Sequence, residues 1–587
     1  LPYIGDHIKL GNSLISGFEE KLKKYFQNPK EKSPFNWKIQ FAEVFDRDGF
    51  NVIIGNPPYV TLLLGKKQKF VDREELEYYH DQYPHSKEYK MNTFVLFIER
   101  ALKLLKNGGK LGFIIPNTIL TNYHFEKIRK HILNSCKILR IVNINERVFQ
   151  DPETGGNILL ILEKERDLSK RSQNEIKIFG TENCETLAEK IYKEDCISQD
   201  SFVQIPNLKF LLDKTAIDLM MKLEENCVRL GDILITYQGI ITGNNKKFLS
   251  NEKETPQHKK ILRGRDINRY RLKFIDVYVL FDEDKLWSNT NEKMFLVDEK
   301  LISRQTSDHL VATYDNKKYF TLDSTHVLIP KTKEYNLKYI LAIFNSKLIN
   351  YYYQTLVPEV GRAFAQVKTV HLKMLPIHKI DFNDQKEKLM HNELVELVDR
   401  MLLLNRKSCQ IVTKFERYMA EPVVGYVPFR KYYEKLGVID KKAAEKTAKG
   451  LIRKLEVEEK NNWLVFKVDF TVREKSGKRK LVGVEILRCR FRDITLRRFL
   501  YHAINNYKKA LGTGNILYKI LTIKIPLFDR NPEKNRQLID RLMKEYLKAV
   551  EEKKQFEKEI RDTDELIDNK IYELYSLDPK EISLVKG

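Results

Sequence analysis

The stretch Phe50-Asn51-Val52-Ile53-Ile54-Gly55-Asn56-Pro57-Pro58-Tyr59 sets the architecture of the first part of the chain. Its first five residues form an apolar, β-branched run that stops at a Gly-Asn-Pro-Pro turn, as a buried parallel strand does. Further elements are predicted nearby: a helix at 92–106 that ends at Asn107-Gly108-Gly109, and strands at 9–10, 111–115, 138–144 and 158–162. This alternation of strands and helices predicts a doubly wound α/β sheet.

Composition limits the class of protein. The 587 residues are 42% hydrophobic, so we expect two to four globular domains rather than disorder. The net charge of +23 attracts polyanions, of which nucleic acid is the commonest and an anionic membrane surface the alternative. Without an apolar run of about 18 residues, a membrane-spanning helix is not expected. The six scattered cysteines form no Cys-x-x-Cys pair, which argues against zinc and disulfides and favours a cytoplasmic setting.

The chain divides by pattern into four parts. Residues 1–165 carry the α/β alternation, and residues 166–205 are polar, with little periodicity, as in a linker. Residues 206–405 hold short strand-like runs and turns, which predicts a mixed α/β domain closed by a helix near 394–404. Residues 406–587 are mixed and then helical, with strand-like runs at 463–472 and 516–525, a basic helix at 493–509 and a long amphipathic helix at 538–577 that we interpret as solvated on one side.

The loop Asn56-Pro57-Pro58-Tyr59 has the residue types that methylation of an exocyclic adenine amine requires. That amine is a poor nucleophile, because its lone pair is delocalised into the ring. Two acceptors aimed at its N–H bonds, the Asn56 side-chain oxygen and the rigid Pro57 carbonyl, would free the lone pair. The Tyr59 ring offers a stacking face for a base that has left the duplex. A sulfonium methyl donor is implied and a metal is not; the alternative is an ordinary turn, since Asn-Pro and Pro-Pro are common in loops.

The stretch from Ile54 to Val60 resembles motif IV of the γ-class adenine-N6 DNA methyltransferases. Residues 33–37 and 41–45 resemble the segment before that motif in type IIG restriction-modification enzymes, and Gly11-Asn12-Ser13-Leu14-Ile15 resembles motif III. Asn51 stands where the family often has Asp. The resemblance implies a partial Rossmann-like methyltransferase domain at 1–165 that carries motifs III to VIII and uses S-adenosylmethionine.

The resemblance assigns roles by position. It implies that Asn56 and the Pro57 carbonyl accept from the target amine and that Tyr59 stacks on the flipped adenine. Phe149 matches the motif VIII aromatic that packs against the base, and Phe97 matches the motif V aromatic near the cofactor adenine. Asn12 matches a position that contacts the same adenine. Taken singly, Phe97 and Phe149 also fit core aromatics, but their order around the loop favours the functional roles.

The glycine-rich motif I of the family would precede motif III, and no residue before Gly11 supplies it. We therefore expect an N-terminally truncated chain, whose natural whole includes the missing motif I half and, in type IIG enzymes, a nuclease. A permuted order is not expected: Gly512-Thr513-Gly514 follows a helix-like run and precedes a strand-like one, whereas a cofactor loop needs the reverse. Asp469 and Glu485 have nuclease-like spacing, but Leu487 stands where a lysine is needed.

The segment 206–405 resembles the TaqI-like C-terminal specificity domain, on residues 239–246, 261–270, 303–306, 345–348 and 375–377. The resemblance implies target recognition in double-stranded DNA. Arg pairs bidentately with guanine and Gln or Asn with adenine, whereas Lys contacts phosphate. Our candidates for DNA contacts are Gln238, Arg265, Arg269 and Arg304, each of which singly also fits a plain surface residue.

Three functions remain open from the sequence. The first is a site-specific DNA methyltransferase that modifies adenine N6 in a restriction-modification system. The second is a catalytically inactive DNA-binding specificity fragment, because motif I is missing. The third, an RNA or protein-glutamine methyltransferase, shares the Asn-Pro-Pro-Tyr loop but uses other targeting parts than the 206–405 region.

Overall fold

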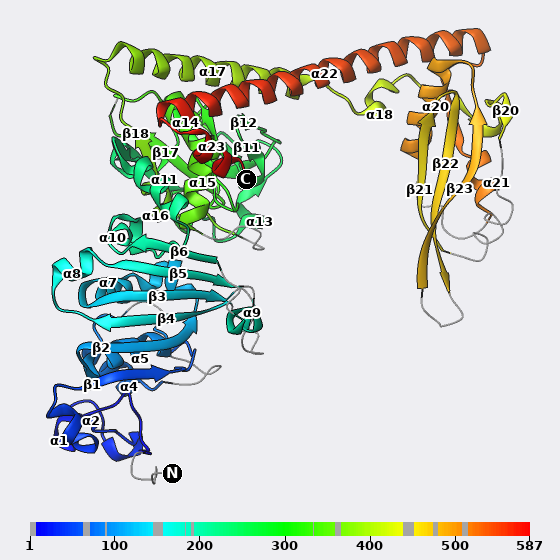
Figure 1. Cartoon of the computed structure of the whole chain (residues 1–587). Helices are drawn as coiled ribbons and strands as arrows, with labels where there is room; N and C mark the ends of the chain where they lie inside the picture. The colour runs from blue at the N-terminus through cyan, green and yellow to red at the C-terminus, as the bar shows by residue number, and fades with distance from the viewer. Residues whose placement is uncertain are drawn as a thin grey trace. The chain divides into compact units, whose positions relative to one another are not determined.

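A computed structural model describes most of the chain, and Figure 1 shows it coloured along the sequence. The described residues divide into two compact units: the first comprises Leu1–Asp399 and Leu566–Gly587, and the second Arg400–Glu565. The described residues are 8–62, 71–87, 91–144, 156–181, 183–189, 193–332, 334–357, 365–437, 451–473, 479–507 and 515–587.

The first unit begins with a six-stranded sheet in the order β1-β2-β4-β3-β5-β6. The pairs β1/β2 and β3/β5 are parallel, and the other neighbours are antiparallel. The predicted α/β sheet is therefore present as a mixed one, with β1 at an edge. Its strands are β1 (Phe50–Gly55), β2 (Leu105–Pro116), β3 (Cys136–Ile144), β4 (Asn157–Lys164), β5 (Glu175–Thr181) and β6 (Lys193–Ser198).

The linker expected at 166–205 is wrong, because β5 and β6 extend the sheet there. In β5 the buried Ile176 and Ile178 alternate with the exposed Glu175 and Lys177. An alternating strand near an edge keeps only one face apolar. The charged residues of that pattern lower the mean hydropathy of the segment, so the sequence did not predict a strand there.

Three smaller predictions also need correction. Residues 9–10 form no strand, and Leu10 is exposed. Asn107-Gly108-Gly109 lies inside β2 rather than after the helix; Gly108 has a φ of 78°, so the strand bends there instead of starting later. The strand expected at 516–525 is a helix, α21 (Ile516–Leu521), followed by β24 (Lys524–Leu527), because a capping Asn515 starts the helix. Gly512-Thr513-Gly514 lies outside the described residues.

Helices connect the strands of this sheet. Helix α5 (Thr93–Leu104) starts where the Asn92 side chain accepts from the Phe94 N–H, and most of its residues are buried. Helix α7 (Glu126–Ser135) contributes the fully buried Arg129, which donates to the Ile119, Asn122, Asn207 and Leu208 carbonyls. The other helical elements up to residue 208 are α1 (Glu19–Leu22), η2 (Pro29–Lys32), α2 (Trp37–Gln40), α3 (Ala42–Phe45), α4 (Arg73–Gln82), α6 (Thr118–Thr121), η3 (Tyr123–Phe125), α8 (Leu168–Ser172), α9 (Cys184–Ala188), α10 (Ser201–Gln204) and η4 (Pro206–Leu208).

The remainder of the first unit is a mixed α/β region with two four-stranded sheets, in the orders β15-β14-β17-β8 and β16-β10-β13-β9. A fully buried ion pair joins Lys300 to Asp315 across the first sheet at 2.8 Å. The strands of the two sheets are β8 (Leu234–Gln238), β9 (Leu249–Ser250), β10 (His258–Leu262), β13 (Tyr278–Leu280), β14 (Lys300–Arg304), β15 (Ala312–Asp315), β16 (Phe320–Thr321) and β17 (Thr325–Pro330). Around them lie α11 (Lys214–Glu224), β7 (Cys227–Arg229), α12 (Leu230–Ile233), α13 (Asn245–Phe248), η5 (Gly264–Asp266), β11 (Ile267–Asn268), β12 (Arg271–Leu272), η6 (Glu292–Met294), α14 (Leu337–Asn345), α15 (Lys347–Leu356), α16 (Thr369–Lys373), β18 (Pro376–His378) and the closing helix α23 (Pro579–Lys586).

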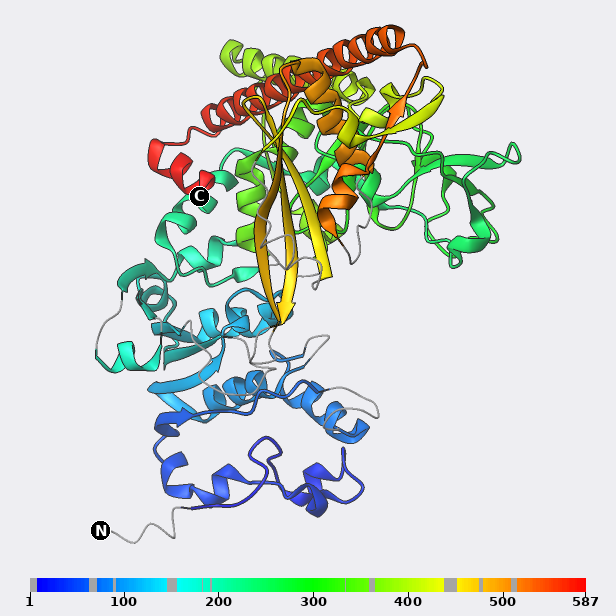
Figure 2. The ribbon, with the colours of Figure 1, turned by 90° about the vertical axis from the view of Figure 1, so that its right-hand side faces the viewer.

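The second unit is built on the antiparallel sheet β20-β23-β22-β21. Helix α20 (Ile494–Tyr507) packs on it around a core that includes Phe466 and Phe499. Figures 1 and 2 show the strands running past α20. Its elements are α18 (Phe415–Tyr418), β19 (Gly425–Pro428), η7 (Phe429–Lys431), β20 (Lys435–Leu436), β21 (Leu451–Lys460), β22 (Trp463–Arg473), β23 (Arg479–Arg490), α20, α21 and β24, with parts of α17 (Gln385–Gln410) and α22 (Pro532–Leu574).

Helices α17 and α22 confirm the two helices predicted near 394–404 and 538–577, and α20 the one at 493–509. Within the described ranges, no helix is both long enough and apolar enough to cross a lipid bilayer.

Candidate active site and recognition surface

The Asn56–Tyr59 loop leaves the sheet at the end of β1 and is fixed by the first residue of α5. The Thr93 backbone N–H donates to the Val60 carbonyl at 2.9 Å, and the Val60 N–H donates to the Thr93 hydroxyl oxygen at 2.9 Å. The Thr93 hydroxyl donates in turn to the Pro58 carbonyl. The helix start thus holds the chain directly before and after Tyr59.

Tyr59 and Asn56 are joined by a hydrogen bond. The Tyr59 hydroxyl lies 3.0 Å from the Asn56 Oδ1 and 3.0 Å from the Ile114 carbonyl oxygen at the end of β2. Burial raises the pKa of Tyr59 to about 12, although the neighbouring Asn157 amide acts against the shift. The hydroxyl therefore stays protonated and has one hydrogen for two acceptors. The hydroxyl can therefore give up its hydrogen bond to Asn56 and keep the one to the Ile114 carbonyl.

A cavity of about 450 Å³ opens beside the loop and has the size of a ligand site. Asn56, Pro57 and the half-buried Phe97 all line it, so the structure brings these three predicted residues together. Tyr59 lies next to it, with its ring edge-on to Phe94 at 6.3 Å. The full lining is Ser13, Trp37, Phe50, residues 52–58, Phe97, Arg100, Ala101, Leu104 and Phe113.

Asn12, for which the resemblance implies a cofactor contact, closes a local turn in the structure. Its Oδ1 accepts from the Leu14 N–H at 3.1 Å and from the Ile15 N–H at 3.4 Å, which closes a local turn. Its neighbour Ser13 lines the cavity instead. A ligand contact by the Asn12 oxygen would have to compete with that turn. Phe149 lies outside the described residues.

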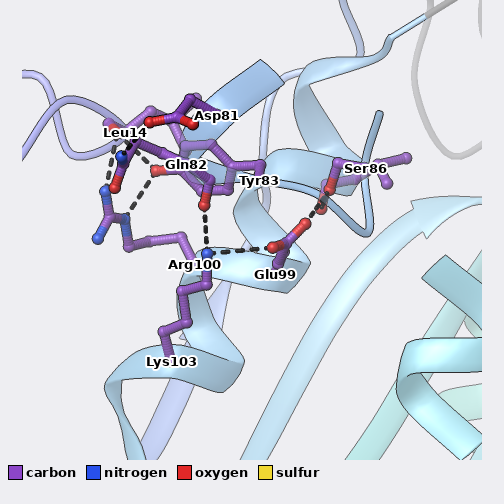
Figure 3. Close-up of polar contacts among 9 residues, drawn as sticks. Leu14, Asp81, Gln82, Tyr83, Ser86, Glu99, Arg100 and Lys103 are labelled. Carbon is purple, nitrogen blue, oxygen red and sulfur yellow. Dashed lines mark hydrogen bonds and ion pairs between the residues drawn. The ribbon is translucent and has the colours of Figure 1, made fainter. Parts of the chain in front are cut away.

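A polar network that the sequence did not indicate supports the cavity wall (Figure 3). Arg100 donates to the Leu14 carbonyl at 2.9 Å and to the Tyr83 hydroxyl at 2.8 Å, and Tyr83 donates to the same carbonyl. One residue before Arg100, the buried Glu99 accepts from Ser86 at 2.8 Å and pairs with a lysine of α5. The network ties the Ser13–Leu14 turn to α5, so two walls of the cavity keep a fixed separation.

β1 is exposed along the cavity. Its side chains Val52 and Ile54 are 55% and 83% exposed, although both are large and apolar. They line the cavity together with Trp37 and Phe50. An apolar edge strand of this kind is ready to pair with a further strand.

S-adenosylmethionine is the cofactor implied by the resemblance, and the lining residues suit its nucleoside end. Trp37, Phe50 and Phe97 offer aromatic faces for an adenine ring. Arg100, the charged group of the lining, is directed at Leu14 and Tyr83. The lining residues of the described chain thus fit a nucleoside better than an amino-acid tail.

The recognition candidates meet at the turn of residues 322–325. The Gln238 side-chain amide donates to the Asp323 carbonyl at 3.1 Å. The Gly264 N–H donates to the Ser324 hydroxyl at 2.9 Å, and a Cβ on Gly264 would come within 2.7 Å of the Ser324 carbonyl. Only glycine allows this close approach. The turn therefore places Gln238 and the segment that carries Arg265 side by side.

Arg304 is half-buried and bonds to the 264–268 turn. Its guanidinium donates to the Gly264 carbonyl at 3.1 Å, to the Ile267 carbonyl, and to the Asn268 Oδ1 at 3.1 Å. Burial lowers its pKa from the ordinary value. Its Nε and Nη2 donors thus hold the 264–268 turn.

The two remaining arginines frame the same turn. Arg265 is exposed on η5, and Arg269 lies with its guanidinium 5.8 Å from the centre of the Tyr270 ring. Asp266, between them, is buried and accepts from the Arg263 N–H at 2.9 Å. The buried carboxylate fixes the turn, and the exposed Arg265 is displayed on it.

Comparison with known proteins identifies both regions. Residues 6–149 match the Eco57I restriction-modification methylase family, and residues 259–377 match the TaqI-like C-terminal specificity domain. The chain is 27% identical over 428 residues to the putative type II restriction enzyme and methyltransferase RM.MjaORFECS2P of Methanocaldococcus jannaschii. That alignment covers 69% of this chain and 33% of the archaeal protein.

Two further relatives are bacterial proteins. The type II restriction enzyme and methyltransferase RM.Eco57I of Escherichia coli is 23% identical over 482 residues, 67% of this chain and 46% of that protein. The type II methyltransferase M.HindII of Haemophilus influenzae is 23% identical over 470 residues, 68% of this chain and 88% of that protein. The chain thus spans between a third and a half of the two restriction–methylation proteins and most of M.HindII. It combines a segment similar to the Eco57I restriction-modification methylase family with a segment similar to the TaqI-like C-terminal specificity domain.

Proposed function

We propose that the chain is the methyltransferase part of a restriction-modification system and modifies adenine N6 within a specific site of double-stranded DNA. The observation that carries the proposal is the loop geometry. Asn56 and Pro57 line one cavity with the aromatic Phe97, and the Asn56 oxygen is held by a neutral Tyr59 hydroxyl. An amine entering the cavity meets acceptors that are already oriented.

The loop's own groups perform the activation. An amine N–H that reaches Asn56 replaces the Tyr59 hydroxyl, which keeps its hydrogen bond to the Ile114 carbonyl. The second N–H is received by the Pro57 carbonyl, because Thr93 already engages the Pro58 carbonyl. With both N–H bonds directed at acceptors, the nitrogen lone pair is freed for attack. S-adenosylmethionine supplies the electrophilic methyl group when it is bound.

The target base has to leave the duplex before it can reach this loop. Gln238 and Arg265, which the 322–325 turn holds together, are proposed to read base edges, and Arg269 to contact the backbone or a base nearby. Arg304 is proposed to position the turn. The names of the relatives, restriction enzymes and methyltransferases, support DNA as the substrate.

A second candidate is a DNA-binding specificity body that needs a further segment for catalysis. Val52 and Ile54 favour it, because these exposed side chains on β1 line the cavity that would hold the cofactor. A strand that pairs with β1 would cover them and enclose the amino-acid end of the cofactor. In this case the chain alone would bind DNA but retain S-adenosylmethionine weakly.

Titration calorimetry with S-adenosylmethionine, followed by transfer of a tritiated methyl group to unmethylated DNA, separates the two candidates. The methyltransferase predicts saturable cofactor binding and label in DNA, lost in Asn56→Ala. If the chain binds DNA but not S-adenosylmethionine, the second candidate, a DNA-binding specificity protein that needs a further segment for catalysis, is correct. Gln40→Ala is the matched control, since this exposed amide on α2 lies outside the cavity.

A further inference from the structure

A fully buried amide without a hydrogen bond lies near the Asn56–Tyr59 loop. Asn157 is the first residue of β4, and its side chain is completely excluded from solvent. Neither its Oδ1 nor its Nδ2 forms a hydrogen bond within the described part of the chain. Buried amides in folded proteins nearly always have a partner, because an unsatisfied one lowers stability. An amide that is kept in this state indicates a role in another state of the protein, such as the one with a ligand bound.

The sheet places Asn157 at the end from which the loop projects. β4 lies between β2 and β3 (Figure 1). Asn157 is paired with Pro116, the last residue of β2, and with Ile144, the last residue of β3. The Ile114 carbonyl, which accepts from the Tyr59 hydroxyl, lies on β2 two residues before Pro116. The buried amide and the oxygen of Tyr59 are therefore neighbours at one end of the sheet.

The backbone beside Asn157 is fixed by the turn that follows β2. The Asn117 N–H donates to the Gly156 carbonyl at 2.9 Å, and a Cβ on Gly156 would come within 2.7 Å of the Asn117 Nδ2. Such close packing leaves little room for the chain to shift. We therefore expect the Asn157 side chain to stay beside Tyr59 whether or not the loop is occupied.

The electrostatic effect of Asn157 on Tyr59 shows which side of the amide faces the hydroxyl. Burial raises the pKa of Tyr59 to about 12, and the Asn157 amide acts in the opposite direction. A neighbour that lowers the pKa of a phenol stabilises the phenolate, so the N–H side of the amide faces the Tyr59 oxygen. That oxygen donates its hydrogen toward Asn56 and Ile114, and its lone pairs can accept. Asn157 is thus placed to donate to Tyr59.

We propose that Asn157 is a positioning residue for the Asn56–Tyr59 loop: its amide donates to the Tyr59 oxygen once an amine has displaced the Tyr59 hydroxyl from Asn56. The inference rests on the proposed methyl transfer and adds a residue to it. With Ile114 accepting and Asn157 donating, the Tyr59 oxygen is held from two sides while the ring packs against the base. Because the new bond forms when the loop is occupied, it favours the occupied loop.

The first test is a double-mutant cycle of Asn157→Leu and Tyr59→Phe, measured as single-turnover methyl transfer to DNA by the full chain. Asn157→Leu keeps the approximate size of the side chain and removes both polar atoms. It should slow transfer by about 3- to 10-fold, the effect of one hydrogen bond. In the Tyr59→Phe background the same change should have no further effect, because no oxygen remains to be held. An equal loss in both backgrounds would overturn the proposal.

Thermal unfolding separates this role from a structural one. Asn157→Leu should keep or raise the melting temperature, since it removes a buried amide that has no hydrogen bond. The matched control is Asn174→Leu, because the Asn174 amide near the other end of the same sheet donates to the Ile138 carbonyl at 2.8 Å and to the Gln199 Oε1 at 3.0 Å. The control should lower the melting temperature and leave the transfer rate of the folded protein unchanged. A melting temperature that falls with activity in Asn157→Leu would overturn the proposal.

A second readout needs no methyl transfer. Replacing Tyr59 with a ring-fluorinated tyrosine brings the phenol pKa into a range that the fold tolerates, and fluorine NMR then follows the titration in the cofactor-free chain. In Asn157→Leu, and in the smaller Asn157→Val, this pKa should rise by about 0.5 to 1, because the donor to the phenolate is lost. In Asn174→Leu it should stay the same. An unchanged pKa in both Asn157 variants would overturn the proposal. If the original chain transfers no methyl group, the proposed function fails and this titration still decides the role of Asn157.

Discussion

The loop proposed for catalysis and the turn proposed for DNA recognition are both short segments fixed by hydrogen bonds, yet they use their polar residues in opposite ways. In the loop at 56–59, the polar side chain of the motif lines a cavity and Thr93 holds the backbone. In the turn at 264–268, the guanidinium of Arg304 donates to the Gly264 carbonyl and to the Asn268 side chain. The exposed Arg265 remains for a ligand.

The contrast shows how far residue type predicts role. An Asn before two prolines has little freedom, because proline fixes φ and leaves the amide at the strand end. An arginine has a long side chain that reaches several backbone carbonyls, so its position in the sequence does not decide whether it serves the fold or a ligand. Function is therefore easier to predict for the loop than for the turn.

The largest effect is expected for the loop. Asn56→Ala should reduce methyl transfer by about 10²–10³-fold, as the loss of one preorganised polar contact does elsewhere. DNA affinity and the melting temperature should change little, because Asn56 is exposed. Single-turnover transfer, DNA anisotropy and thermal unfolding measure the three quantities. If the variant loses DNA affinity in proportion to activity, Asn56 contributes to DNA binding rather than to methyl transfer. The loop and the turn would then not differ in the way proposed.

Arg304→Ala should act on stability. Removing the donors to the Gly264 and Ile267 carbonyls and to Asn268 should lower the free energy of unfolding by about 2–3 kcal/mol and weaken site-specific binding with it. Urea unfolding followed by fluorescence measures the first effect. Arg304→Lys should rescue little, since a single ammonium cannot reach all three acceptors. If Arg304→Ala is as stable as the original chain, Arg304 does not hold the turn, and the prediction that it contacts DNA stands.

Arg265→Ala should show the converse pattern. As an exposed side chain it should change the unfolding free energy by no more than about 0.5 kcal/mol. Removal of a base contact should cost about 1–3 kcal/mol of discrimination, or about 5- to 150-fold, between the specific site and one with a changed base pair. Competition binding with both duplexes gives the ratio. If discrimination is unchanged, Arg265 is a plain surface charge.

Tyr59→Phe should have the smallest effect. The ring and its contact with Phe94 remain, whereas the hydroxyl bond to Asn56 disappears. Transfer should slow by about 3- to 10-fold, equivalent to about 0.5–1.5 kcal/mol. The pKa of Tyr59 near 12 keeps the hydroxyl protonated well beyond neutrality, so the ratio of the two rates should stay constant between neutral and moderately alkaline pH. A ratio that falls toward one within this range would show a phenolate and contradict the proposed donor.

Local pattern predicted the parts of the fold that are apolar and regular. The helix at 92–106 and the long helix ending near 577 have periods that a buried face requires. The run at 50–54 forms the predicted strand β1, but the prediction that this strand is buried is wrong, because β1 lies at the sheet edge with Val52 and Ile54 exposed. Strand β5 was not predicted, because its sequence alternates apolar with charged residues. Of the candidate site, Asn56, Pro57 and Phe97 could be placed by motif. The Arg100–Tyr83–Leu14 network could not, because its members are far apart in sequence and meet only in the folded chain.

The identity of the methylated base is the sharpest test of adenine methylation by the Asn56–Tyr59 loop. DNA incubated with the chain and labelled S-adenosylmethionine is digested to nucleosides and separated by chromatography with mass detection. We predict that the label appears as N6-methyldeoxyadenosine and disappears in Asn56→Ala. Label in a methylated cytosine, or label that survives in Asn56→Ala, would contradict this mechanism.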